Sequence, residues 1–89
     1  RFEIIIYPQE ILRVRESYPG YTFKREFEDG EIVFDVLSKE EVSESNTYLM
    51  YFYYGKEKYI IMGDINEKEL EEIAIEYKNI VLEYNDRIE

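Results

Sequence analysis

The sequence lacks histidine and cysteine altogether, and these two absences exclude most catalytic chemistry. There is no Ser-His-Asp or Cys-His pair, and no side chain titrates near neutrality without a shifted pKa. Zinc, haem and iron–sulfur sites lose their usual ligands, and no disulfide can form. The four glycines are isolated, so no glycine-rich phosphate loop exists. We therefore predict that the chain is not an enzyme and holds no cofactor.

Basic residues are also scarce, with 11 Lys and Arg against 21 Asp and Glu and a net charge of −10. This balance opposes binding to nucleic acid or to an anionic membrane surface, because both need clustered cations. An acidic surface suits solubility alone, or a basic protein partner whose encounter is steered by charge. The sequence thus predicts a protein partner or self-association, and no nucleic acid.

Long apolar runs are missing as well, so we expect no membrane insertion of this segment. No signal peptide is visible, and the chain opens at Arg1 rather than at methionine, which suggests a segment excised from a longer protein. What the chain does contain is an apolar and aromatic set large enough for a core: 45% hydrophobic residues, with ten Tyr and five Phe. We expect one domain spanning residues 1–89.

The first third of the chain predicts a strand, a short helix and a hairpin. Residues 2–7, F-E-I-I-I-Y, are typical of a strand, and Pro8 is expected in the first turn of a helix over residues 9–18 that Pro19 and Gly20 end. Residues 21–28 alternate, with Tyr21, Phe23, Arg25 and Phe27 expected on one face. Asp29-Gly30 predicts a type I′ turn into a strand over residues 31–37.

The remainder predicts a polar loop, a second hairpin and a long helix. Residues 38–46 are polar, residues 47–54 and 58–62 are typical of strands, and Gly55-Lys56 turns the chain between them. Asn66 is a favoured N-cap for a helix, with Glu69 three residues later. That helix has apolar side chains at spacings of three and four, namely Leu70, Ile73, Ala74, Tyr77, Ile80, Val81, Tyr84 and Ile88.

This order, β-α-β-β-β-β-α, predicts an α+β fold. We expect a two-layer sandwich in which an antiparallel sheet of four to five strands carries the long C-terminal helix on one face.

Carboxylates are the remaining chemical candidates, since acid pairs can act as general acid and base. With so many acids, close pairs are expected by chance. The run D-I-N-E-K-E-L-E-E resembles an oxygen-rich calcium loop, but it lacks the glycine at the sixth position and reads better as a helix start. Asp35 lies inside an apolar strand. We expect it to face solvent or to pair across the sheet with Arg25 or Lys24, the alternative being a buried carboxylate at a site.

The aromatic stretch Y-L-M-Y-F-Y-Y at positions 48–54 is the strongest candidate for recognition. Both of its faces are largely apolar, so each face needs a cover. Three interpretations remain open: ordinary core, a protein or peptide interface, and a small-ligand platform. For the interface, the candidate residues are Tyr48, Tyr51, Tyr53 and Tyr54.

The run Y-I-I-M-G-D-I followed by E-L-E-E-I-A resembles the C-terminal part of a domain of unknown function found in extracytoplasmic parts of membrane-anchored regulators and lipoproteins of spore-forming bacteria, including anti-sigma-factor-like proteins. The resemblance covers about a third of the chain, and the tryptophan often present in the preceding strand is missing. It implies a non-enzymatic sensory or interaction domain in an extracytoplasmic location; without it, a cytoplasmic one is expected. The matching positions are Tyr59, Ile61, Gly63, Ile65, Glu69, Leu70, Ile73 and Ala74.

Taken together, these patterns favour a non-catalytic protein-interaction or regulatory module of a longer protein. The alternative is an acidic inhibitor, such as an immunity protein or a nucleic-acid mimic, that occludes a basic partner.

Overall fold

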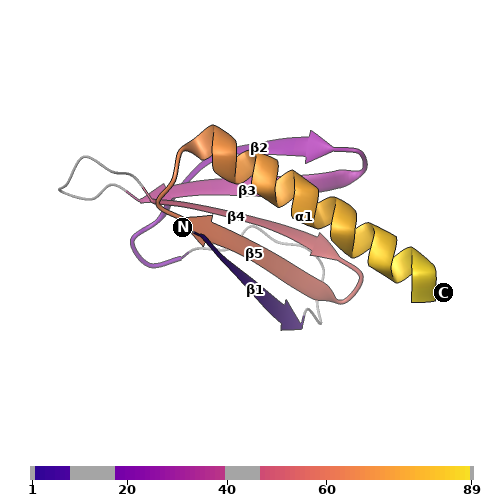
Figure 1. Cartoon of the computed structure of the whole chain (residues 1–89). Helices are drawn as coiled ribbons and strands as arrows, with labels where there is room; N and C mark the ends of the chain where they lie inside the picture. Colours follow the sequence, from indigo (N-terminus) through magenta and orange to yellow (C-terminus); the bar gives the residue numbers. More distant parts are fainter. Residues whose placement is uncertain (1, 9–17, 40–46, 89) are drawn as a thin grey trace.

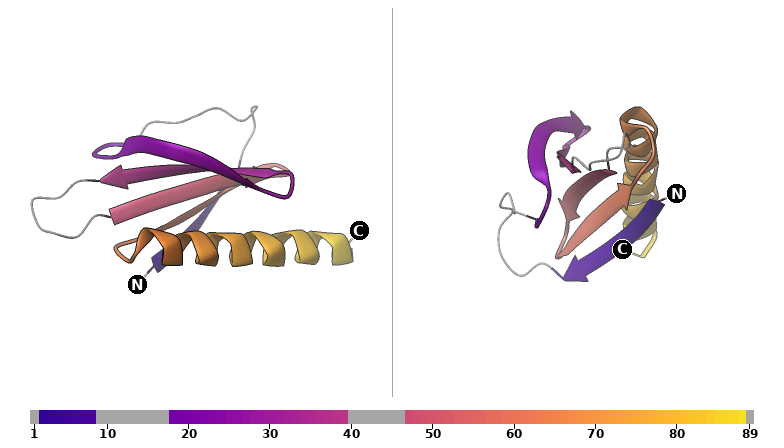
Figure 2. Two further views of the ribbon diagram at one scale, coloured as in Figure 1. Left: turned by 90° about the horizontal axis from the view of Figure 1, so that it is seen from above. Right: turned by 90° about the vertical axis from the view of Figure 1, so that its left-hand side faces the viewer.

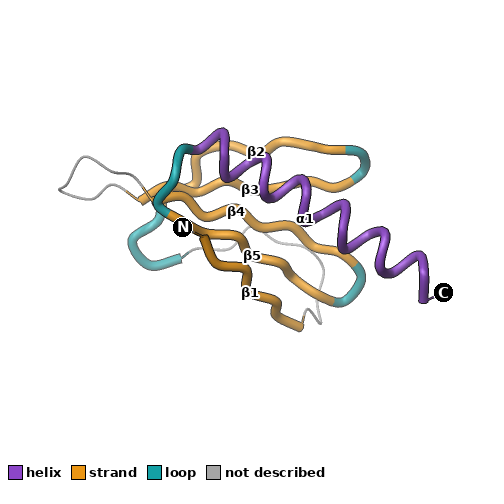
Figure 3. Tube along the Cα trace, viewed as in Figure 1, coloured by secondary structure: helices purple, strands orange, loops and turns teal. Residues whose placement is uncertain are grey.

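The computed structural model describes residues 2–8, 18–39 and 47–88 (Figure 1). Along the chain it has β1 (Phe2–Pro8), β2 (Thr22–Asp29), β3 (Ile32–Lys39), β4 (Thr47–Tyr54), β5 (Glu57–Gly63) and α1 (Glu67–Ile88). The strands form one antiparallel sheet in the order β1-β5-β4-β3-β2. The helix covers one face of this sheet (Figures 2 and 3), which confirms the predicted two-layer α+β arrangement.

The start of the chain differs from the prediction at Pro8, which does not open a helix. Pro8 is the last residue of β1 and stands opposite Glu57 of β5. β1 lies at the edge of the sheet, where a residue without a backbone N–H is tolerated. The short helix was predicted over residues 9–18, of which residues 9–17 lie outside the described residues. Pro19 and Gly20 form a turn in which the Tyr21 N–H donates to the Tyr18 carbonyl at 3.0 Å.

Both predicted hairpins are confirmed, but the first turn has a different type from the one predicted. Asp29 pairs with Ile32, so the two central residues are Gly30 and Glu31. Gly30 has a φ of 67°, and no described residue other than glycine has a positive φ. Glycine with positive φ at the first central position is the requirement of a type II′ turn, whereas type I′ needs positive φ at both. Gly55, with a φ of 63°, starts the turn between β4 and β5 in the same way.

β2 contains an irregularity that the alternation of its residues does not predict. Phe23 pairs with Leu37 and Arg25 with the adjacent Val36, so Lys24 is an extra residue on β2. Such a bulge moves the residues on its two sides to opposite faces of the sheet. The expectation that Phe23 and Arg25 share a face is therefore wrong: Arg25 points to the helix side, and Phe23 lies on the other side.

The sheet is packed on both faces. On the helix side, buried residues from β3, β4 and β5 meet the helix; we call this the helix-side core, and it contains Phe34, Val36, Met50, Phe52, Tyr59, Ile61, Leu70, Ala74 and Val81. On the opposite side a smaller cluster, the far-side core, contains Leu37, Leu49, Tyr51 and Ile60, with Tyr18, Tyr21 and Tyr53 packed against it. Both faces of β4 are thus covered within the chain.

Helix α1 begins where the sequence predicts. The Asn66 side-chain oxygen accepts the backbone N–H groups of Lys68 at 2.8 Å and Glu69 at 3.4 Å, and two glutamates lie in the first turn. Its buried side chains are Leu70, Ala74, Lys78 and Val81.

Loss of this cap should weaken the helix start. We expect Asn66→Ala to lower the free energy of unfolding by about 1 kcal/mol, since two amide donors lose their acceptor. Urea denaturation measures the change. Asn66→Asp keeps the acceptor and should leave stability near that of the parent, and an Asp variant as weak as the Ala variant would contradict the capping role.

The apolar face of α1 is only partly buried, which differs from the prediction. Ile80 is 54% exposed and Tyr84 is 63% exposed, although both follow the apolar spacing. Lys78 is buried in their place, and its amine lies 2.5 Å from Asp29 at the end of β2. The helix is thus turned so that Lys78 faces the sheet and Ile80 and Tyr84 face outward.

Candidate functional site

The four predicted interface tyrosines lie on two different faces of the sheet. Tyr48 and Tyr54 pack beside the helix-side core, where both are half-buried. Tyr51 and Tyr53 belong to the opposite face, where Tyr51 is fully buried and Tyr53 half-buried. Since the two pairs are separated by the sheet, they do not form one common surface. An interface role for Tyr48, Tyr53 and Tyr54 stays a prediction, while the Tyr51 ring is part of the core.

The far-side core contains a buried lysine that sequence reasoning missed. The Lys58 amine lies 4.4 Å from the ring centre of Tyr51, 4.6 Å from that of Tyr18 and 5.7 Å from that of Tyr53. It also hydrogen-bonds to the Tyr18 hydroxyl. Aromatic faces stabilise a cation most when water is excluded. The only sequence signal was an isolated lysine in register with the tyrosines of the neighbouring strand.

Asp35 is the second buried polar group on this face, and the expectation that it faces solvent is wrong. Its side chain is fully buried and stands opposite Glu26 on β2 and Tyr51 on β4. It does not pair with Arg25 or Lys24 either, because both of these side chains bond to helix α1 on the other face. The bulge at Lys24 is the physical reason for this separation.

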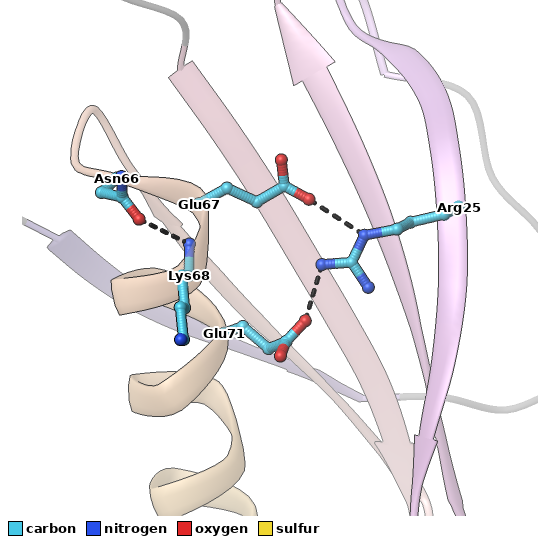
Figure 4. Close-up of a pocket in the computed structure, with 5 residues that line it drawn as sticks. All are labelled: Arg25, Asn66, Glu67, Lys68 and Glu71. Atoms are coloured by element: carbon cyan, nitrogen blue, oxygen red, sulfur yellow. Dashed lines mark hydrogen bonds and ion pairs between the residues drawn. The ribbon is translucent and has the colours of Figure 1, made fainter.

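A cluster of ion pairs connects the start of α1 to β2. Its residues Arg25, Glu67 and Glu71 line an open hollow of about 370 Å³ (Figure 4). The Arg25 guanidinium donates to Glu67 at 2.9 Å through Nε and to Glu71 at 2.6 Å through its terminal nitrogen. Lys24 also bonds to Glu67. Both carboxylates in the hollow are therefore engaged by cations of the same chain, and a ligand would have to displace them. We assign this cluster a structural role.

These contacts shift the ionisation of the cluster. Burial alone would raise the pKa of Glu67, but hydrogen bonds from Lys24 and Arg25 outweigh it and hold the pKa below its ordinary value of 4.5. The Glu67 carboxylate in turn raises the pKa of Lys24. The fold therefore favours the charged form of both partners.

The lowered pKa of Glu67 predicts a dependence of stability on pH. Because the native state binds this proton less tightly than the unfolded chain, the stabilisation is complete above pH 4.5 and is lost as the pH falls through the lower native pKa. We expect Glu67→Gln to destabilise the fold at neutral pH and less at an acidic pH below 4.5, as measured by urea denaturation. Glu72→Gln, on the outward face of the same helix, is the control. An equal deficit of Glu67→Gln at both pH values would contradict this role.

The Tyr59 hydroxyl and the acidic run before α1 have structural roles. Burial raises the pKa of the Tyr59 hydroxyl, and the hydrogen bond it donates to Glu57 at 2.6 Å raises it further, so it stays protonated near neutrality. The run D-I-N-E-K-E-L-E-E forms the helix start, as expected. Within residues 2–8, 18–39 and 47–88, no group of three metal-ligating side chains is gathered.

Among the described residues, the two most exposed large apolar side chains lie on the outward flank of α1. Ile80 and Tyr84 are more than half exposed there, and Ile73 and Tyr77 on the same flank are half-buried. The Tyr77 ring packs edge-on against Tyr59 of β5 at 6.0 Å. Ile6 of β1 stands opposite Tyr59 in the sheet and is 48% exposed. We call the surface formed by Ile6, Tyr77, Ile80 and Tyr84 the apolar flank.

Comparison of the chain with protein-family models, with curated proteins and with solved structures found no match. The resemblance of residues 59–74 to a bacterial extracytoplasmic domain therefore stays a prediction. No helix in the described part of the chain is long and apolar enough to cross a membrane. The apolar flank was missed at the sequence level because the spacing of its residues is the same as that of the buried positions beside it.

Proposed function

We propose that this domain is a non-catalytic protein-interaction module that binds its partner through the apolar flank. The observation that carries the proposal is the exposure of Ile80 and Tyr84, two large apolar side chains on the outward flank of α1. Single exposed apolar residues are ordinary, whereas a grouped set rimmed by charge is typical of interaction sites. Tyrosine and isoleucine supply contact area at small cost in side-chain entropy.

The absence of histidine and cysteine supports a module without catalysis, as does the engagement of the hollow's carboxylates by Arg25 and Lys24. The predicted bacterial regulatory role accords with this proposal, and it rests on the resemblance alone.

The test uses the double variant Ile80→Ser/Tyr84→Ser. Since both side chains are exposed, we expect the variant to remain folded and to lose about 1 kcal/mol or less. Binders are selected from a displayed library of protein fragments and then measured against parent and variant. The proposal expects binders whose affinity falls by about tenfold or more in the variant, equivalent to about 1.4 kcal/mol.

The matched control is Lys68→Ser/Glu72→Ser, which also places two serines at exposed helix positions and leaves the net charge unchanged. It should retain binding. A selection whose binders all tolerate Ile80→Ser/Tyr84→Ser would overturn the proposal.

The alternative of an acidic inhibitor is favoured by the net charge of −10. An acidic inhibitor should bind a basic protein with an affinity that falls steeply as the salt concentration rises. This affinity should not depend on Ile80 or Tyr84. Binding of a cationic protein that survives the double serine variant would favour the inhibitor over the module.

A further inference from the structure

The two flanks of α1 differ in how they are attached to the sheet. The flank toward β2 is held by charge, through Glu71 with Arg25 and Lys78 with Asp29. On the opposite flank the Tyr77 ring packs against Tyr59 of β5 at 6.0 Å, and Ile73 packs against the helix-side core. The edge of the sheet at β1 therefore lies on the side of α1 that carries Tyr77.

The sheet is wider than one helix can cover. Five strands at about 4.8 Å spacing span about 20–25 Å, whereas a helix with its side chains is about 10–12 Å across. Helix α1 packs mainly on β4 and β5, and Figure 1 shows β1 to the side of it. Figure 2 shows the last turns of α1 extending past the ends of the strands. The helix side of β1, where Ile6 is 48% exposed, thus lies beyond the width of α1.

The apolar flank has the spacing of a helix-packing seam. Leu70, Ile73, Tyr77, Ile80 and Tyr84 follow one another at intervals of three, four, three and four residues, which is the a/d pattern of a heptad repeat. Leu70 is buried under the helix, and exposure grows along the seam to Tyr84. The exposed end of this seam, at Ile80 and Tyr84, offers a facing helix two apolar side chains to pack between its own.

The charges beside the seam identify the partner's chemistry. Glu69, Glu76 and Glu83 recur every seven residues at the g position, and all three are exposed. The basic residues of the helix are Lys68, Lys78 and Arg87, and the buried Lys78 faces Asp29. Residues at g interact with residues at e of a parallel partner, so the seam has an acidic rim that lysine or arginine would complement.

A second copy of this chain does not satisfy that requirement. In an antiparallel pair, the glutamates at g would face the same glutamates of the other copy. In a parallel pair they would face the e positions Ala74 and Val81, which are buried against their own sheet. A net charge of −10 on each copy adds repulsion.

From these observations we infer that the apolar flank binds a basic amphipathic helix of another protein, which lies beside α1 over the helix side of β1 with lysine or arginine facing Glu69, Glu76 and Glu83. The inference rests on the proposed function and adds the partner's class. The bound helix would complete a second layer of two helices on the sheet and cover Ile6, Ile80 and Tyr84.

The test uses defined synthetic helices and fluorescence anisotropy. The probe is a peptide of about three heptads with leucine at a and d and lysine at e and g. One comparison peptide has glutamate in place of the lysines, and another has the probe's composition in scrambled order. We expect the probe to bind the full chain at least about tenfold more tightly than either comparison, more weakly at high salt, and about tenfold more weakly to Ile80→Ser/Tyr84→Ser. Lys68→Ser/Glu72→Ser should bind like the parent.

Charge reversal supplies the second arm. Glu76→Lys/Glu83→Lys should lose preference for the lysine probe and gain preference for the glutamate peptide. Three results would each overturn the inference. The probe and the scrambled peptide could bind equally, or Ile80→Ser/Tyr84→Ser could leave binding of the lysine probe unchanged. Sedimentation could also show that the parent is a dimer and that Ile80→Ser/Tyr84→Ser is a monomer. If library binders depend on Ile80 and Tyr84 but are extended or acidic, the interaction module stands and the basic helix does not. If no binder depends on them, both fail.

Discussion

Replacing Tyr51 with alanine is expected to lower the free energy of unfolding by about 3–5 kcal/mol, a large part of what a domain of this size has. The Tyr51 ring is fully buried in the far-side core and contacts Tyr18 and Tyr53 at centroid distances of 5.9 and 5.7 Å. The Lys58 amine would also lose its nearest aromatic face, at 4.4 Å. The variant thus combines a large cavity with a poorly solvated cation.

Urea denaturation followed by circular dichroism measures this effect, and Tyr84→Ala is the matched control. The control removes the same side chain from a position that is 63% exposed, so we expect a change of about 0.5 kcal/mol or less. A Tyr51→Ala protein with the parent's unfolding midpoint would show that the far-side core contributes little.

Placing a carboxylate at position 74 should detach helix α1 from the sheet. Ala74 is fully buried in the helix-side core, one turn after Leu70, and its small side chain allows the helix backbone to approach the strands closely. Ala74→Glu would need both room and hydration that this position does not offer, and we expect a loss of about 4 kcal/mol or more. Unfolding midpoint, helical circular dichroism and binding of a hydrophobic dye report the outcome.

Asn79→Glu adds the same carboxylate to an exposed position of the same helix, and it should leave the unfolding midpoint nearly unchanged. A loss at position 74 no larger than that at position 79 would contradict the close packing of α1 on β4 and β5.

The elements that the sequence predicted correctly are those with local causes. The hairpins at Gly30 and Gly55 follow from turn chemistry, and the helix start at Asn66 follows from its side chain capping the first amides. Even so, the predicted type of the first turn was wrong, because Gly30 can take the positive φ of either primed turn type, and the sign of φ at Glu31 excludes type I′.

The features that the sequence did not predict depend on how elements meet. The bulge at Lys24 brings two cations of β2 toward the carboxylates of α1, and strand alternation contains no information about that meeting. The rotation of α1 about its axis likewise decides that Lys78 is buried and Tyr84 exposed. Apolar residues at spacings of three and four form a helix face that is wider than the part of the helix in contact with the sheet. Periodicity alone therefore does not predict which of these residues face the sheet.

The candidate site lies elsewhere than predicted for the same reason. The density of rings at positions 48–54 indicated β4, and the need for a cover on both of its faces was correctly predicted. The cover comes from within the chain: α1 on one face, and on the other a cluster that includes Tyr18. The surface that stays exposed is the outward flank of α1, where Ile80 and Tyr84 lie.

Hydroxyl-radical footprinting of the tyrosines, with and without the lysine-bearing helical probe, tests this account most directly. We predict rapid labelling of Tyr84 and little labelling of Tyr51 in the free chain, following their exposure. Addition of the probe should protect Tyr84 and leave Tyr53 and Tyr54 of β4 unchanged. Protection of Tyr53 or Tyr54 with Tyr84 still labelled would place the interface on the aromatic strand and contradict the account.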